Sequence, residues 1–225
     1  MNSLLKKVKT MLSATAATTQ PTITVEPSRL SGPHIIDANA QSGYLAGQML
    51  VATPVLDSGC FQKSVVYVFA HNADGAMGLI LNQPMEMLSY ASLMEGMDLP
   101  KIAADRDIPV FFGGPVERSR GFVIHSADYY REFSLARGAE LSVTASSAIL
   151  NDILEGNGPK HSALVVGYAG WSAGQLEAEI DANSWITVPA TAELMFNTDN
   201  ELKWATAGKS LGIDIALMST AVGHA

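Results

Sequence analysis

The sequence predicts an α+β fold, and three observations lead to that prediction. Short runs rich in β-branched and aromatic residues, which are typical of strands, follow one another closely along the chain. Segments with helical spacing of apolar residues do not alternate strictly with these runs, which disfavours a doubly wound sheet. The chain has 225 residues, 48% of them hydrophobic, which is enough for one well-buried core.

The first forty residues are predicted to form a flexible tail, and residues 41–225 a single domain. The tail contains Pro21, Pro27 and Pro33 without a sustained apolar period, which is typical of a linker. Its beginning, MNSLLKKVKTML, lacks the continuous apolar run of a signal peptide because lysines interrupt it. A weak amphipathic or transit-like segment is the alternative for these first residues.

The first half of the domain is expected to consist of strands joined by tight turns. Residues 49–53 and 64–70 are short and rich in β-branched and aromatic side chains. The turn residues Asn72-Ala73-Asp74-Gly75 then precede an apolar run over residues 77–81, so a β-hairpin is predicted there. Met and Leu at helical spacing predict a helix over residues 85–97.

The second half of the domain is expected to mix strands with short helices. A strand over residues 108–112 stops at Gly113-Gly114-Pro115, so residues 113–121 are predicted to form the loop before the next strand. Residues 139–143 are predicted to form an edge strand. Thr198-Asp199-Asn200-Glu201 has the pattern of a capping box, which predicts a last helix that reaches about residue 211. The other predicted strands are residues 122–125, 163–168 and 185–188, and the other predicted helices are residues 147–155 and 175–180.

The charge of the chain disfavours direct binding to nucleic acid. The formal net charge is −8, and the first 25 residues hold three Lys and no acid, so residues 26–225 carry −11. Nucleic-acid binders normally present a basic face to the phosphates. No window approaches the ~18 apolar residues of a transmembrane helix. Cys60 is the single cysteine, so neither an internal disulfide nor a cysteine-based zinc site is expected, which fits a reducing, cytoplasmic setting.

One stretch has the pattern of the nucleophile elbow of serine hydrolases. Gly170-Trp171-Ser172-Ala173-Gly174 fits G-x-S-x-G and lies between a predicted strand and a predicted helix. Acidic residues and then His224 follow Ser172, which is the chain order of that triad. The competing interpretation is structural: the glycines permit a tight turn, Trp171 fills the core, and Gln175 begins the helix.

Six motifs follow one another along the domain. They are LVATP at residues 50–54, SVVYVFAHNADGAMGLILNQP at 64–84, FGGPVERSRGFVIH at 112–125, GYAGWSAGQLEAEI at 167–180, NSW at 183–185 and LGID at 211–214. Together they resemble the AlgH/YqgE family of bacterial proteins, from about residue 43 to the C-terminus. The resemblance implies a mixed, mostly antiparallel sheet with a small barrel-like portion and helices packed around it.

The resemblance also bears on function. Members of the AlgH/YqgE family are often labelled transcriptional regulators, and the family has no established biochemical activity. In the family, the position of Ser172 is as readily glycine as serine, so the architecture does not depend on a hydroxyl there. The structural interpretation of the Gly-x-Ser-x-Gly stretch is therefore favoured, and no catalytic residue, metal ligand or cofactor is predicted.

Polar and glycine residues at the ends of predicted strands are the candidate ligand-binding residues. A glycine turn that enters a helix presents free N–H groups to an anion, and a close pair of arginines can hold a phosphate. Each group also has a structural interpretation, as a strand corner, a satisfied histidine or a solvated surface pair. The candidates are His71, Asn72, Asn82, Gly113, Gly114, Arg118, Arg120, His125, Gly170, Trp171, Gly174 and Gln175.

The sequence is expected to be that of a non-enzymatic cytoplasmic protein, and the family resemblance implies that it regulates transcription indirectly. Its partner is expected to be an unknown protein or a small molecule, with direct binding to nucleic acid disfavoured and no membrane involved. The first alternative is a protein that binds a small ligand, nucleotide or phosphate, or a hydrolase, with its site near GYAGWSAGQLE. Direct DNA binding is the second alternative.

Overall fold

The computed structural model describes residues 36–37, 43–57, 59–86, 108–131, 134–146 and 148–218. Of the helix predicted over residues 85–97, all but the first two residues lie outside the described ranges. Most of the predicted tail also lies outside them. The strands are β1 (Ile36–Asp37), β2 (Gln48–Ala52), β3 (Val65–Asn72), β4 (Gly75–Ile80), β5 (Val110–Phe112), β6 (Val116–Ser126), β7 (Ser134–Arg137), β8 (Leu141–Thr144), β9 (Ser162–Ser172) and β10 (Trp185–Pro189). The helices are α3 (Ala148–Leu154), α4 (Gln175–Asp181) and α5 (Asn200–Lys209), with short helical turns η1 (Gly59–Phe61), η2 (Glu193–Asn197) and η3 (Ile215–Leu217).

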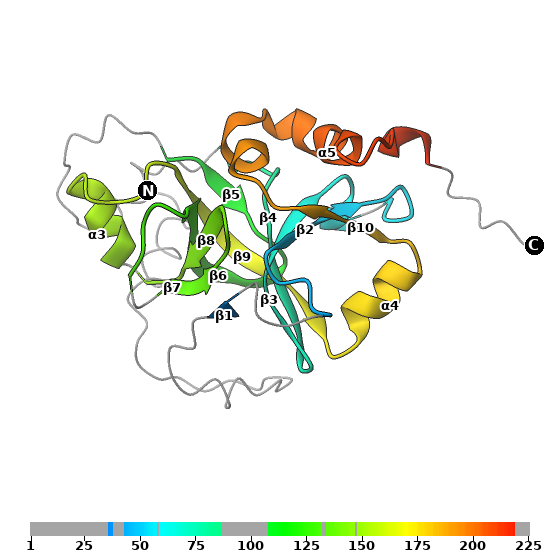
Figure 1. The fold of residues 1–225 in the computed structure, drawn as a ribbon, viewed down its shortest axis with the longest axis horizontal. Helices are drawn as coiled ribbons and strands as arrows, with labels where there is room; N and C mark the ends of the chain where they lie inside the picture. The colour runs from blue at the N-terminus through cyan, green and yellow to red at the C-terminus, as the bar shows by residue number, and fades with distance from the viewer. Residues whose placement is uncertain are drawn as a thin grey trace, which may run out of the picture.

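The strands form one curled sheet with the shape of half a barrel (Figure 1). In the described part of the chain the strand order is β1-β7-β8-β6-β9-β4-β3-β2-β10, and β5 pairs with β9 off this path. Only the β1–β7 and β5–β9 pairs of this sheet are parallel. The α+β prediction is therefore confirmed, with the mixed, mostly antiparallel sheet that the family resemblance implied.

The long strand β9 joins the two halves of the sheet. Its first part pairs with β5 and β6, and its last four residues pair with β4. Gly167, with a φ of 76°, kinks the strand between these parts. A Cβ atom on Gly113 would lie 2.3 Å from the carbonyl oxygen of Gly167, and one on Gly114 would lie 2.2 Å from the carbonyl carbon of Tyr168. The missing side chains therefore let two backbone segments touch.

The predicted hairpin of β3 and β4 lies in the middle of the core. The two strands pair antiparallel across a turn at residues 72–75. Val65, Tyr67 and Phe69 belong to the apolar cluster inside the curl, whereas Val66 and Val68 belong to the cluster beneath α4. Burial on both faces explains why the sequence of β3 is a continuous apolar run instead of an alternating one.

Helices cover the β2–β10 end of the sheet from opposite sides (Figure 1). Trp204 of α5 packs in the same cluster as Met49 of β2, and its indole N–H donates to the carbonyl of Ala52 at 2.7 Å. Leu176 of α4 packs on the other side, in the cluster of Leu50. Each helix thus buries one apolar stripe against the sheet, and α4 is held with its charged side toward solvent.

The loop predicted over residues 113–121 is wrong, because β6 begins at Val116. Between the pairs Val116–Tyr168 and Gly121–Val166, six residues of β6 lie opposite three of β9, so the strand bulges outward. The four bulged residues, 117–120, are exposed, and Glu117 has a φ of 40°. Exposed polar residues and a glycine conceal a strand from a search for apolar runs.

The strand predicted over residues 139–143 is present as β8, but its predicted position at an edge of the sheet is wrong. The observed strand β8 lies between β7 and β6, and β7 itself was not predicted. Edge and interior strands cannot be told apart by composition when the strand has only four residues. The predicted capping box does not form either: α5 begins at Asn200, and the hydroxyl of Thr198 donates to the carbonyl of Glu193 at 3.2 Å.

Candidate functional site

The Gly-x-Ser-x-Gly stretch spans the end of β9 and the entry to α4. Gly170, Trp171 and Ser172 are the last three residues of the strand and pair with β4, so the expectation that Gly170 takes part in a tight turn is wrong. The turn starts after Ser172, and Gly174, with a φ of 72°, is the N-cap of α4. Only Gly174 of the two motif glycines needs the left-handed conformation that glycine favours.

A carboxylate on α4 organises this site. Oε2 of Glu179 accepts the indole N–H groups of Trp171 at 2.9 Å and Trp185 at 2.8 Å. The other oxygen, Oε1, accepts the side-chain amide of Gln175 at 2.9 Å, one helical turn earlier. Both oxygens of this carboxylate are thus occupied by protein donors, and the bonds tie α4 to β9 and β10.

The two indoles also pack against each other. Trp171 and Trp185 meet edge to face with ring centroids 6.0 Å apart, and Phe61 lies 6.4 and 5.7 Å from them. Both tryptophans are buried, at 6% and 3% exposure. Trp171 therefore fills the core beside the sheet, as the structural interpretation of the motif expects, and its one polar atom has a partner.

The hydroxyl of Ser172 lies at the surface and is bound by its neighbour. Its Oγ donates to Oε1 of Gln175 at 3.0 Å, and the same oxygen accepts the backbone N–H of Ser172 at 3.0 Å. An activated serine needs a basic acceptor, such as a histidine nitrogen, to take its proton. An amide oxygen is not such a base, so the contacts among the described residues hold the turn together. His224, the histidine in the chain order of the triad, lies outside the described residues.

His71 reaches the same helix from β3, but both of its nitrogens are used. Nδ1 accepts the backbone N–H of Leu45 at 3.0 Å, which places the ring proton of the neutral imidazole on Nε2. Nε2 lies 2.9 Å from Oε1 of Glu177 on α4 and donates to it. The ring of Tyr44 packs edge-on against the imidazole at 5.0 Å. His71 therefore anchors the segment before β2 to α4.

The two candidate asparagines make local structural bonds. Oδ1 of Asn72 accepts the backbone N–H of Asp74 at 2.8 Å, which shapes the hairpin turn. Asn82 joins the chain before β3 to the chain after β4: its side chain accepts from the N–H of Val65 at 2.9 Å and donates to the carbonyl of Lys63 at 2.8 Å. Each side chain has satisfied backbone partners in this structure.

The arginine pair lies on the bulge of β6. Arg118 lies over the ring of Phe112 at 5.7 Å, and Arg120 over the ring of Phe122 at 5.2 Å. Arg120 also contacts the carboxylate of Glu117 at 3.4 Å, and both side chains are about half exposed. The neighbouring Gly113 and Gly114 lie against the backbone of β9, which fills the space where a ligand would approach them.

His125 lies at the far end of the sheet from the Gly-x-Ser-x-Gly stretch. It pairs with Ser162, the first residue of β9, whereas Ser172 is the last, so about 30 Å of strand separate them at ~3.3 Å per residue. The imidazole is fully buried; Nδ1 donates to the carbonyl of Ser126 at 3.0 Å, and Nε2 lies 3.1 Å from Oγ1 of Thr144. Burial lowers the pKa of His125.

The structure thus brings together only part of the candidate set. His71, Trp171, Gly174 and Gln175 meet around α4, whereas Arg118 and Arg120 lie on the β6 bulge and His125 at the other end of β9. Nowhere in the described ranges do three His, Cys, Asp or Glu side chains gather closely enough to hold a metal ion. A ligand for these residues stays a prediction.

Two residues that organise the site, Glu179 and Trp185, are absent from the candidate set. The sequence placed Trp185 only in a predicted strand. The spacing of Gln175 and Glu179, four residues apart on one helix face, was a usable signal for their contact. The pairing of Glu179 with Trp185 comes from tertiary packing and has no local signal.

The comparisons with known proteins identify the family. The model of the AlgH-like family matches residues 49–216, which is well over half of the chain. The chain belongs to the AlgH-like family.

Relatives of the family cover most of this chain. A "UPF0301 protein" of Jannaschia sp. is 45% identical over 183 residues, which are 80% of this chain and 95% of the relative. A second "UPF0301 protein", from Mesorhizobium japonicum, is 46% identical over 194 residues, which are 83% of this chain and 95% of that relative. The solution structure of the AlgH protein from Pseudomonas aeruginosa is 36% identical with a TM-score of 0.66, covering 83% of this chain and 98% of that one.

A more distant neighbour shares the family's fold alone. The crystal structure of a Corynebacterium diphtheriae protein is 20% identical, with a TM-score of 0.60 over 81% of this chain and 97% of that one. The resemblance found in the motifs is therefore confirmed at the level of family and fold.

None of the helices in the described part of this chain has the length and hydrophobicity needed to span a bilayer.

Proposed function

We propose that the protein is a non-catalytic regulator that influences transcription indirectly, by binding a partner protein. The observation that carries this proposal is the closed hydrogen-bond network at the Gly-x-Ser-x-Gly stretch. The hydroxyl of Ser172 donates to Gln175, and the amide of Gln175 donates to Glu179. The carboxylate of Glu179 also accepts the N–H groups of both indoles. Such a network stabilises a rigid surface element, and among the described residues it gives the serine no base.

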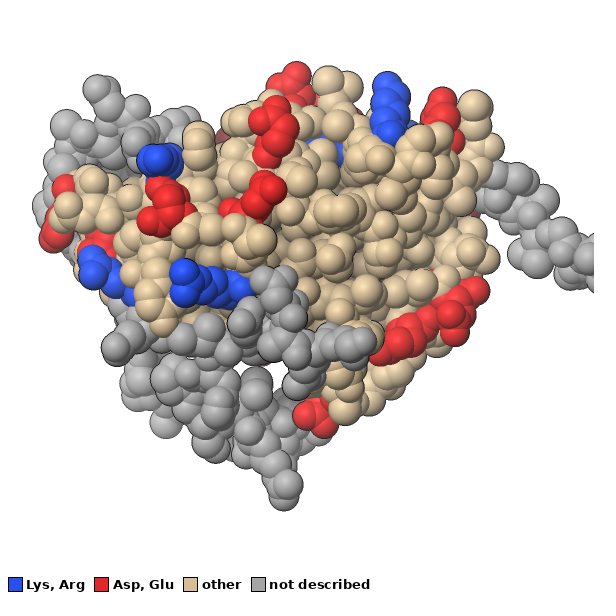
Figure 2. Space-filling view, viewed as in Figure 1, with Lys and Arg blue, Asp and Glu red and all other residues tan. Residues whose placement is uncertain are grey.

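The charge distribution supports a protein partner over DNA. Glu177 and Asp181 of α4 are exposed, and so is Asp74 at the hairpin tip. Figure 2 shows acidic side chains in a row over α4. From residue 162 to residue 218 the chain has seven Asp and Glu against two Lys, and Lys203 is buried. A surface of this sign repels the phosphates of a duplex and steers basic protein surfaces toward it.

The first test of the proposal measures DNA binding by the purified chain. Duplex fragments from genes whose transcript levels depend on the protein are mixed with it in a gel-shift experiment at physiological salt. We expect weak binding without sequence preference. A tight shift that survives competitor DNA would contradict indirect regulation.

The second test looks for the partner in cells. A photo-crosslinking amino acid replaces the exposed Ala178 on α4, and the control variant carries it at the exposed Glu155, at the end of α3. We expect one protein to be captured from position 178 and not from position 155, and its removal to abolish the regulatory effect. Equal capture from both positions, or a regulatory effect that persists without the captured protein, counts against the proposal.

A further inference from the structure

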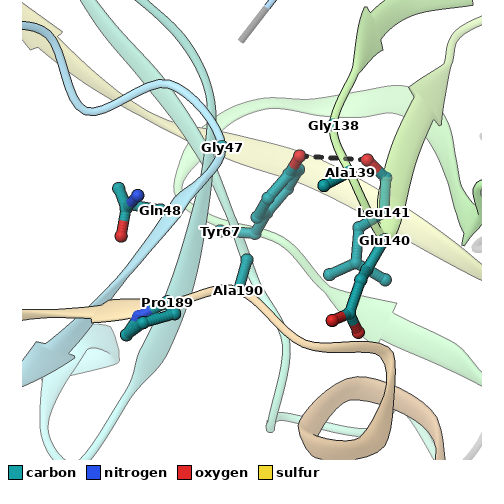
Figure 3. A pocket seen from close by; sticks show the side chains of 9 residues that line it. All are labelled: Gly47, Gln48, Tyr67, Gly138, Ala139, Glu140, Leu141, Pro189 and Ala190. Carbon is teal, nitrogen blue, oxygen red and sulfur yellow. Dashed lines mark hydrogen bonds between the residues drawn. The ribbon is translucent and has the colours of Figure 1, made fainter. Parts of the chain in front are cut away.

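The curled sheet leaves a cavity where its two ends approach each other. The cavity has a volume of about 170 Å³ and lies between the start of β2, the β7–β8 turn and the segment that follows β10. Strands β2 and β10 are at one end of the strand order and β7 and β8 near the other. Figure 3 shows Tyr67 of β3 between the two sides, with its hydroxyl directed to the carbonyl of Leu141.

Hydrogen bonds hold this cavity open in a defined shape. The carbonyl of Leu141 accepts both the Tyr67 hydroxyl at 3.2 Å and the backbone N–H of Gly138 at 2.8 Å. A Cβ atom on Gly138 would lie 2.8 Å from the Tyr67 hydroxyl, so glycine is required for this approach. On the other side, Oε2 of Glu140 accepts the backbone N–H of Ala192 at 2.7 Å, which fastens the turn to the segment after β10.

The lining of the cavity has no positive charge to balance Glu140, and its one side-chain amide, that of Gln48, is neutral. The single proton of the Tyr67 hydroxyl is given to Leu141, so only its lone pairs are left for another molecule. Burial raises the pKa of Tyr67 to about 12, which keeps the hydroxyl neutral at physiological pH. Within the described residues, Oε1 of Glu140 accepts no hydrogen bond from the protein, and the lining contains neither Lys nor Arg.

The size of the cavity restricts its ligand to a small group. Pockets for drug-sized ligands measure roughly 300–1,000 Å³, so a volume of about 170 Å³ is too small for a nucleotide. A planar guanidinium on a short alkyl chain has a suitable size. It also supplies the positive charge that the lining lacks, with N–H donors in a fork that matches a carboxylate.

We propose that this cavity is a binding site for an alkylguanidinium cation, whose N–H groups donate to Glu140 and to the lone pairs of Tyr67. The negative charge of the chain, −8 in total, attracts the cation to the protein. The cation can come from a free small molecule or from the arginine side chain of another protein. This site lies apart from α4 and does not depend on the regulatory function proposed above.

The experiment is an NMR titration of the full ¹⁵N-labelled chain with N-ethylguanidinium. We expect saturable shifts of the amide signals of Gly47, Gly138 and Leu141, which border the cavity. N-ethylurea, which has the same shape without the charge, is expected to bind about tenfold more weakly or not at all, as is usual when a charge-assisted hydrogen bond is lost. In a second arm, an arginine with blocked termini is the probe, and the tighter of the two guanidinium ligands indicates the natural source.

Two variants decide whether the binding depends on the cavity. Glu140→Gln keeps an acceptor for the N–H of Ala192 and removes the charge, so we expect it to weaken N-ethylguanidinium binding about tenfold while the spectrum stays that of a folded protein. Glu155→Gln changes an exposed acid on α3's C-terminal side and should not alter the affinity. Shifts that do not saturate, that are equal for N-ethylurea, or that persist unchanged in Glu140→Gln would overturn the proposal.

Discussion

The hydroxyl of Ser172 donates to the side-chain oxygen of Gln175 at 3.0 Å. Gln175 is itself fixed, because its amide donates to Glu179 at 2.9 Å. The serine of the Gly-x-Ser-x-Gly stretch is therefore the outer member of a chain of hydrogen bonds that ends on the buried indoles. This relationship explains why a motif with the pattern of a nucleophile elbow is compatible with a non-catalytic protein.

The substitution Ser172→Ala should change the free energy of unfolding by less than about 0.5 kcal/mol, because the side chain is exposed. The adjacent substitution Trp171→Ala should cost roughly 3 to 5 kcal/mol, since it empties space in the core. Urea denaturation of both variants measures the difference. Equal losses of stability would contradict the structural role of Trp171.

The substitution Glu179→Gln should lower the free energy of unfolding by about 1–3 kcal/mol, because an amide N–H₂ would then face either the indole N–H groups or the amide of Gln175. The control is Glu177→Gln, two residues earlier on α4. Its side chain is 49% exposed and would still accept from His71, so we expect a change below about 0.5 kcal/mol. The prediction is wrong if the two variants unfold at the same denaturant concentration.

Two glycines with positive φ should respond differently to alanine. Gly156 has a φ of 77° and open space where a Cβ would lie, so Gly156→Ala should cost about 1–2 kcal/mol for the backbone conformation alone. Gly114 has a φ of 151°, and its Cβ would collide with the backbone of Tyr168 at 2.2 Å. We expect Gly114→Ala to lose at least twice as much stability in a thermal or chemical unfolding experiment. Similar losses would show that the contact between the Gly114 and β9 backbones relaxes easily.

The stability of the protein should rise with pH between about 8 and 10 because of Lys203. Lys203 is 2% exposed, and its ammonium donates to the carbonyl of Leu81 and the side chain of Asn200. Burial lowers the pKa of Lys203 from 10.5 to about 8, so in this range the unfolded chain holds a proton that the folded chain has released. Unfolding then takes up a proton, and the free energy of unfolding should increase by about 2 kcal/mol over these two pH units.

Two comparisons isolate the effect of Lys203. Lys203→Met should abolish the rise between pH 8 and 10, whereas Lys209→Met, on the exposed side of α5, should keep it. Above pH 10 the raised pKa of Tyr67, about 12, works in the opposite direction, because the unfolded tyrosine loses its proton first. A pH profile of the unfolding free energy that is the same with and without Lys203 would disprove the assignment.

The sequence predicted the parts of the fold whose local signals agree with their tertiary surroundings. The hairpin of β3 and β4 has strong strand composition on both sides of a turn with Asn, Asp and Gly, and α4 has a glycine before it and apolar residues four apart. The start of β6 has no such signal, because four of its residues bulge into solvent. Its pairing is imposed by contact with β9, which the sequence of β6 alone does not encode.

For the candidate site, the sequence located the Gly-x-Ser-x-Gly stretch but did not predict the hydrogen bonds that its residues make. Trp171 and Gln175 were selected for their place in a motif, and both take part in the network around Glu179. Trp185 joins that network from β10, and its contact with Glu179 depends on how α4 lies on the sheet. Separations along the chain carry no information on such contacts when the partners sit on different elements.

The measurement that tests the central claim most directly is the labelling of Ser172 by a fluorophosphonate probe, read out by mass spectrometry of the intact protein. The account predicts no adduct on the native chain, because the serine hydroxyl bonds to an amide oxygen and none of the described residues offers it a base. A single adduct on Ser172, lost in Ser172→Ala while the unfolding curve stays unchanged, would contradict it and show an activated nucleophile.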